Sequence, residues 1–318
     1  MKKVLKGIKY VVIFLIVIIV LLILLLLYLS KKPAIPRNYV KQQETGGSIE
    51  ETYAGAGAYE ITSAEYDAGK EGNRQRHFKV WYPVAEGRYP LVVMVNGTGV
   101  PYQKYEELFE HLASWGFVVI GNDYETSWDG EAASLSLTFA LENEELSKII
   151  DADRIGIGGH SQGGEGAFNA VLEQENGSLY QVMFSLSPTN QDLAVALGWG
   201  YDLETDHPYG YDLSRVTIPT LMLAGTGDFD AQTVIPLEKL EENFEAIPDT
   251  VPKVAARRKD TEHGDMLWRS DGYVTAWLRY YLYGDEEAGR VFFGPDAELA
   301  HNVYWQDFTC NPIKNKLY

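Results

Sequence analysis

Residues able to form a serine nucleophile stand at the junction of a predicted strand and a predicted helix. Ser161 lies in Gly159-His160-Ser161-Gln162-Gly163, between the apolar run 154–158 and a stretch at 165–172 that favours a helix. A serine between two glycines at such a junction is held in a strained backbone conformation that presents its hydroxyl to substrate. We therefore expect Ser161 to act as the nucleophile of an acyl-transfer reaction.

A serine hydroxyl needs a base to take its proton, and that base needs a third group to orient it. Enzymes built on this turn place the three groups along the chain in the order Ser, Asp or Glu, His. We predict His263 as the base, because it precedes the predicted last helix, whereas His301 lies in the C-terminal tail. We predict Asp228, which follows the predicted strand 219–224, as the acid, with Asp230 on the same turn as its rival.

The oxyanion of a tetrahedral intermediate needs two hydrogen-bond donors. The nucleophile turn supplies the backbone N–H of Gln162, and a second donor normally comes from the loop after an earlier strand. In this chain that loop is Asn96-Gly97-Thr98-Gly99, whose small residues let a backbone N–H approach the substrate. We predict the N–H of Thr98 as the second donor, although an ordinary strand-to-helix turn would use the same glycines.

Short apolar strands alternate with amphipathic helices along most of the chain. This alternation predicts a mostly parallel sheet covered by helices on both faces. The predicted strands are 77–83, 90–96, 116–120, 154–158, 181–186 and 219–224, and the predicted helices are 105–115, 132–150, 165–172 and 271–283. The aromatic, glycine-rich segment 187–216 is predicted as loop packing or as a lid that shapes the substrate site.

The amino terminus has the pattern of a membrane anchor. A basic tail at 1–10 precedes an apolar span at 11–30, and a polar tether at 31–52 leads to a catalytic domain at 53–318. The span is long enough to cross a bilayer, and no small-residue cleavage site of a signal peptide follows it. We expect a single-pass signal anchor with the catalytic domain outside the cell.

Charge and cysteine content exclude several classes of function. The first 45 residues hold eight of the 27 basic residues and one of the 45 acidic residues, so the remainder carries 19 basic and 44 acidic residues. Such an acidic surface repels nucleic acids. Cys310 is the only cysteine, which excludes an intrachain disulfide and a cysteine-based metal cluster. The segment 228–230 lacks the Gly and Glu of a calcium loop, so we expect neither a metal nor a cofactor.

Several of these motifs together resemble the α/β-hydrolase superfamily. They are Gly-His-Ser-Gln-Gly-Gly, the strand-Asn-Gly-x-Gly loop, Pro-Thr-Leu-x-x-x-Gly-x-x-Asp and His-Gly, spread over about residues 75–285. Within the superfamily the chain is most similar to the branch of dienelactone hydrolases, chlorophyllases and cutinase-like polyesterases. The resemblance implies an eight-stranded sheet, chemistry without a cofactor, carboxylic-ester substrates, and Ser161, Asp228 and His263 as the triad.

Two positions depart from that family pattern. Asn96 replaces the histidine that begins the oxyanion loop in many relatives, which puts the second oxyanion donor in question. Serine also replaces the nucleophilic cysteine of true dienelactone hydrolases, which argues against a dienelactone substrate.

We therefore expect a membrane-anchored serine hydrolase that cleaves a small-molecule, lipid or polyester-type ester. An acyltransferase or a peptidase would use the same triad. A hydrolase fold that has lost its chemistry and acts as a binding module is the alternative from another class.

Overall fold

The computed structural model describes residue 10 and residues 13–22, 33–71, 74–124, 126–199 and 212–311. The chain divides into two units, Met1–Ala34 and Ile35–Tyr318. In the first unit residues 13–22 are helical with exposed side chains, and the rest of the predicted span at 11–30 lies outside the described residues. Within the described ranges, we find no helix with both the length and the apolar character needed to cross a bilayer.

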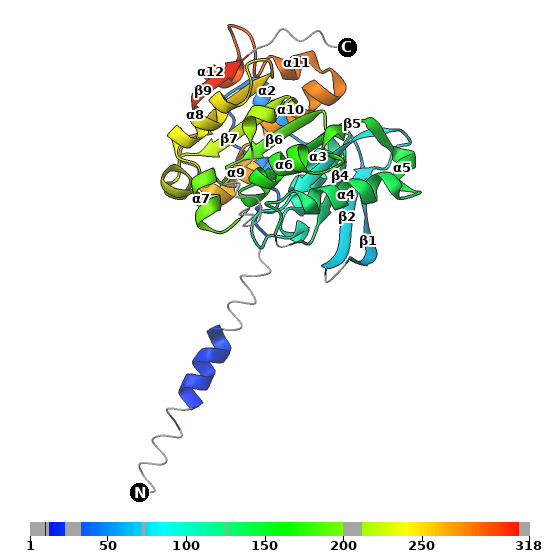
Figure 1. The fold of residues 1–318 in the computed structure, drawn as a ribbon, viewed down its shortest axis with the longest axis vertical. Helices are drawn as coiled ribbons and strands as arrows, with labels where there is room; N and C mark the ends of the chain where they lie inside the picture. Colours follow the sequence, from blue (N-terminus) through cyan, green and yellow to red (C-terminus); the bar gives the residue numbers. More distant parts are fainter. Residues whose placement is uncertain are drawn as a thin grey trace, which may run out of the picture. The chain divides into compact units, whose positions relative to one another are not determined.

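The second unit is built on a mixed sheet in the order β1-β2-β4-β3-β5-β6-β7-β8-β9 (Figure 1). Its nine strands, counted over the described residues, are β1 Ile61–Glu71, β2 Arg74–Pro83, β3 Tyr89–Val95, β4 Val118–Asn122, β5 Ile150–His160, β6 Val182–Leu186, β7 Thr220–Gly225, β8 Lys253–Arg258 and β9 Trp305–Asn311. The central strands from β4 to β8 pair in parallel. The prediction of eight mostly parallel strands was wrong in number, because β1 and β2 form an antiparallel hairpin at one edge and β9 pairs antiparallel with β8 at the other.

Helices connect the parallel strands and cover the sheet. They are α2 Ser48–Ala54, α3 Glu106–Ser114, α4 Glu131–Glu142, α5 Leu146–Ile149, α6 Gln162–Glu173, α7 Gln191–Ala196, α8 Leu237–Ala246, α9 Met266–Arg269, α10 Asp271–Tyr283, α11 Glu286–Gly289 and α12 Glu298–His301. The predicted helix 132–150 is two helices, because the Asn143 side chain accepts hydrogen bonds from the N–H groups of Glu145 and Leu146 and starts a new turn. The predicted helix 271–283 is α10, with the same bounds.

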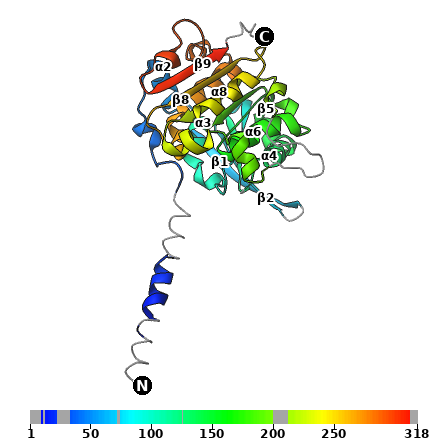
Figure 2. The same ribbon diagram turned by 60° about the vertical axis from the view of Figure 1, so that its left-hand side comes forward.

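Both faces of the sheet are buried, as the run of apolar residues in β3 requires. Every residue of β3 is buried. Val92 belongs to one apolar cluster, which includes Phe109 of α3 and Trp277 of α10. The next residue, Val93, belongs to the other cluster, which includes Phe168 of α6. Alternate residues of one strand therefore hold helices on opposite faces of the sheet, and Figure 2 shows the α4 and α6 side.

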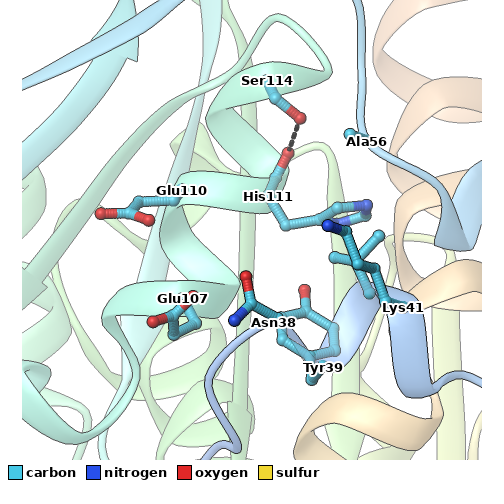
Figure 3. Close-up of a pocket in the computed structure, with 9 residues that line it drawn as sticks. Asn38, Tyr39, Lys41, Ala56, Glu107, Glu110, His111 and Ser114 are labelled. Atoms are coloured by element: carbon cyan, nitrogen blue, oxygen red, sulfur yellow. Dashed lines mark hydrogen bonds between the residues drawn. The ribbon is translucent and has the colours of Figure 1, made fainter.

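The segment after Ala34 belongs to the compact unit, so the predicted start near residue 53 was too late. Tyr39, in the short helix η1 Tyr39–Gln42, is buried, and its hydroxyl donates to Asp271 Oδ2 over 2.5 Å. Nδ1 of His111 lies 2.6 Å from the same carboxylate oxygen. Figure 3 shows Tyr39 and His111 beside a groove of about 260 Å³ between this segment and α3. A buried polar network of Tyr39, His111 and Asp271 thus fixes part of the predicted tether to the domain. The sequence pattern does not reveal this network.

A second buried polar network holds α2. Glu50 accepts a hydrogen bond from Arg258 of β8 over 3.2 Å and another from Trp305 of β9 over 3.1 Å. Glu298 of α12 accepts from the N–H groups of Ile49 and Glu50, which would otherwise be unpaired at the start of α2. The buried acid–base pair explains why a segment of polar composition is part of the folded unit.

Candidate active site

Ser161 occupies the sharp turn between β5 and α6. Its backbone has φ 60° and ψ −124°, a conformation that non-glycine residues rarely adopt. A Cβ at Gly159 would lie 2.3 Å from the carbonyl oxygen of Gly163, and one at Gly163 would lie 2.1 Å from that of Val95. Both flanking residues must therefore be glycine for the turn to pack against the end of β3. The strained, half-buried serine has the backbone geometry expected of a nucleophile.

His263 begins the short helix η6 His263–Asp265 and is paired with a carboxylate. Its Nδ1 lies 2.6 Å from Oδ1 of Asp230. The histidine loop also lies against the nucleophile turn, because the ring centroids of His160 and His263 are 4.3 Å apart. The structure therefore brings the predicted base to the residue next to Ser161.

The carboxylate that meets His263 is that of Asp230, the rival that the sequence left open, and not that of Asp228. Asp230 is fully buried, whereas Asp228 is exposed and accepts a 3.0 Å hydrogen bond from Gln232. The two aspartates are separated by Phe229 at the start of the π-helical turn η5 Asp230–Val234, so they project to different sides of the backbone. The choice between them depends on that turn, which sequence spacing does not reveal.

Asp230 is held in place by three donors. Oδ1 faces His263, and Oδ2 accepts from Ser187 Oγ over 2.6 Å and from the N–H of Gly225 over 2.9 Å. Burial alone would raise the pKa of this carboxyl, but the hydrogen bonds from His263, Ser187 and Gly225 bring the pKa below its usual value. Asp230 is therefore ionised at neutral pH and acts as an acceptor toward His263.

Ser187 is a site residue that sequence analysis missed. It lies just after β6, is fully buried, and has a positive φ of 41°. The strained conformation places its hydroxyl on Asp230, which is 43 residues further along the chain. Its place directly after a central parallel strand was the available signal, because the carboxyl ends of such strands gather at one edge of the sheet.

His160, next to the nucleophile, supports the histidine loop. Its Nε2 lies 2.8 Å from the carbonyl oxygen of His263, so this nitrogen carries a proton and donates it. Burial and the neighbouring charge of His263 lower the pKa of His160 to about 3. The ring is therefore neutral and adds no positive charge beside His263.

The two predicted oxyanion donors lie on neighbouring segments. Gln162 is the first residue of α6, where backbone N–H groups have no partner within the helix. Thr98 lies in an exposed turn after β3, and the preceding N–H, that of Gly97, is already donated to the Tyr105 hydroxyl. Asn96, which departs from the family pattern, is buried and donates from its side chain to the 122–124 segment.

Over the described ranges, no group of three or more His, Cys, Asp or Glu side chains is arranged to hold a metal ion. The candidate site brings together a serine hydroxyl, an imidazole and a buried carboxylate. Such a set suits proton transfer coupled to nucleophilic attack.

Comparison with known proteins shows which ester hydrolases the chain resembles. The Chlorophyllase family model matches residues 51–190, a range that includes Ser161 but ends before Asp230 and His263. Cutinase est1 of Thermobifida alba is 25% identical over 245 residues, which are 73% of this chain and 74% of that protein. Bis(hydroxyethyl) terephthalate hydrolase of Streptomyces coelicolor is 25% identical over 217 residues, which are 65% and 62% of the two chains. Chlorophyllase-1 of Citrus sinensis is 27% identical over 108 residues, 30% of this chain and 33% of that one. Together with the sheet and the strained turn at Ser161, these matches support a place for the chain in the α/β-hydrolase branch that holds chlorophyllases and cutinase-like polyesterases.

Proposed function

We propose that the protein hydrolyses carboxylic esters through an acyl-enzyme, with Ser161 as nucleophile, His263 as base and Asp230 as the acid that orients it. The observation that carries the proposal is the pair of His263 with the buried Asp230, joined over 2.6 Å, with the His263 ring lying against the strained turn at Ser161. The relatives support the same chemistry, because they are a cutinase, a hydrolase of a terephthalate ester and a chlorophyllase.

The tautomer of His263 makes it a base toward serine. Asp230 is ionised and can only accept, so the proton of the neutral imidazole resides on Nδ1. Nε2 is left with a free lone pair, which can take the Ser161 proton as the hydroxyl oxygen attacks the ester carbonyl. The imidazolium then protonates the leaving alkoxide, and a water molecule releases the acid by the same route in the second half of the reaction.

The oxyanion of each tetrahedral intermediate would be held by the backbone N–H groups of Gln162 and Thr98. Gln162 is the donor that the start of α6 provides directly beside the nucleophile. Two observations support Thr98 as the second donor. Thr98 lies in an exposed turn, and the N–H of the preceding residue, Gly97, is already donated to the Tyr105 hydroxyl. Removal of one such donor typically lowers kcat by a factor of about 100 to 1,000.

The test of the proposed function is hydrolysis of p-nitrophenyl acetate together with labelling by a fluorophosphonate, which reacts with activated serines. The wild-type protein should turn over the ester and take up one label, and Ser161→Ala should do neither. Thermal unfolding of both proteins should be alike, because residue 161 is half-buried and small. Equal turnover or equal labelling of the two proteins would remove Ser161 from the reaction.

We extend the proposal to location: a membrane anchor that includes residues 13–22 holds the catalytic unit outside the cell. Ten consecutive residues in this range are helical and exposed in the described structure, and lysines flank the apolar run of the sequence. After alkaline carbonate extraction, the full chain should stay in the membrane pellet, and a chain that begins at Ile35 should be released. Recovery of the full chain in the supernatant would contradict the anchor.

A further inference from the structure

Phe229 is a large apolar side chain exposed beside the candidate base. It is 52% exposed, and its ring stands nearly perpendicular to the ring of His263, at 87° with centroids 5.2 Å apart. A single exposed apolar residue is ordinary on a protein surface. An exposed aromatic ring in contact with the imidazole of a candidate active site is not explained in that way.

The same turn that buries Asp230 directs Phe229 outward. Gly225 allows the turn to fold closely, because a Cβ there would lie 2.3 Å from the carbonyl oxygen of Thr261 and 2.9 Å from Asp230 Oδ2. Asp230 is buried and fixed by three donors, and the side chain of the preceding residue, Phe229, points out of the core. A polar residue would satisfy this exposed position, so the aromatic ring there is not required by the fold.

Further apolar side chains are exposed on the element tied to this turn. Asn190, the N-cap of α7, donates from its side chain to the carbonyl oxygens of Thr233 and Val234 in η5. At the other end of α7, Val195 is 43% exposed and Leu197 is 50% exposed. The turn that contacts His263 and the helix linked to that turn thus both expose apolar groups, which is the usual character of a substrate site.

We propose that Phe229 determines specificity by packing against the aromatic or extended apolar part of an ester whose carbonyl is attacked by Ser161. This inference rests on the proposed function and adds a substrate class to it. The Phe229 ring and the His263 imidazole are in a T-shaped contact. A substrate bound at His263 would therefore contact the Phe229 ring on one side of its scissile bond. Aromatic pairs add binding energy beyond the area they bury, which corresponds to a preference of about tenfold for aromatic over small aliphatic esters.

The test measures kcat/KM for ethyl acetate, ethyl benzoate and phenyl acetate, which are a small ester and two esters with an aromatic group on either side of the bond. Phe229→Ala should lower kcat/KM about tenfold for at least one aromatic ester and less than threefold for ethyl acetate. Phe229→Leu, which keeps an apolar side chain, should recover part of the loss. The matched control is Leu179→Ala, since Leu179 is also exposed but lies in η3 Gly177–Leu179, before β6.

The ratio between substrates separates specificity from a structural role. A uniform loss on all three esters would mean that Phe229 only positions His263, and no loss on any of them would mean that it does not touch substrate; either result overturns the inference. Retained hydrolysis of ethyl acetate in these variants would leave the proposed function standing. Absence of hydrolysis of all three esters by the wild-type protein, with no fluorophosphonate labelling, would instead refute the proposed function itself.

Discussion

Replacement of Asp230 by asparagine changes one oxygen into an NH2 group at almost constant volume. The N–H of Gly225 can only donate, and it points at Oδ2 over 2.9 Å. The amide oxygen of the variant should therefore stay at the Oδ2 position, where Ser187 also donates. The amide NH2 group then occupies the Oδ1 position and faces Nδ1 of His263.

This arrangement reverses the hydrogen bond to the base. The NH2 group donates to Nδ1, so the imidazole proton moves to Nε2, and Nε2 can no longer accept the proton of Ser161. The same substitution in a serine protease triad lowers kcat by about 10⁴, which corresponds to about 5.5 kcal/mol of barrier. We expect a loss of that order for Asp230→Asn.

Asp228→Asn is the matched control, two residues away on the same turn. Asp228 is exposed and loses at most one surface hydrogen bond to Gln232, so kcat/KM should stay within about twofold, since surface substitutions away from a site have small effects. The kcat/KM values of both variants and of the wild-type protein for p-nitrophenyl acetate are compared at about pH 7.5. Thermal unfolding verifies that all three proteins are folded. The reasoning fails if Asp228→Asn is as damaging as Asp230→Asn, or if Asp230→Asn retains more than a tenth of the activity.

Two predictions concern stability. A chain that begins at Ile35 should unfold at nearly the same temperature as the full chain. A chain that begins at Gly55 should not fold, because it loses several buried apolar side chains at about 1.5–3 kcal/mol each and leaves Arg258 without Glu50. Circular dichroism melting curves test both expectations, and a cooperative transition of the chain that begins at Gly55 would contradict the second. Burial, with the charge of Asp129 nearby, raises the pKa of Glu165 from 4.5 to about 9, and neither of its carboxyl oxygens has a hydrogen-bond partner among the described residues. A pKa that is higher in the folded state makes the folded state hold the proton more tightly, so stability is lost as pH rises from 4.5 toward 9, by about 3 kcal/mol at pH 7. Glu165→Gln cannot ionise and should lose less stability over this pH range in urea unfolding; equal pH slopes for the two proteins would exclude the effect.

The match to the family model covers only part of the site. It includes the nucleophile turn and ends at residue 190, before the segments that bring Asp230 and His263. The pairing of these two residues lies outside the matched range. It is seen in this chain's own structure, where η5 and η6, which follow the carboxyl ends of β7 and β8, meet.

Local features of the sequence were sufficient to predict the turn at Ser161 and much of the sheet. The turn at Ser161 follows from neighbouring residues, since two glycines between an apolar strand and a helix permit its strained backbone. The helix 271–283 follows from its apolar periodicity in the same way. These features are determined within a few residues of chain, so no knowledge of distant contacts is needed to predict them.

Tertiary structure decided what depends on distant partners. Asp230 rather than Asp228 meets His263 because Gly225, at the end of β7, and Ser187, just after β6, hold its carboxylate. The segment after Ala34 belongs to the domain because Glu50 pairs with Arg258 across 208 positions of sequence. The free energy of such contacts depends on burial and on hydrogen-bond geometry, and both arise only when the sheet has assembled.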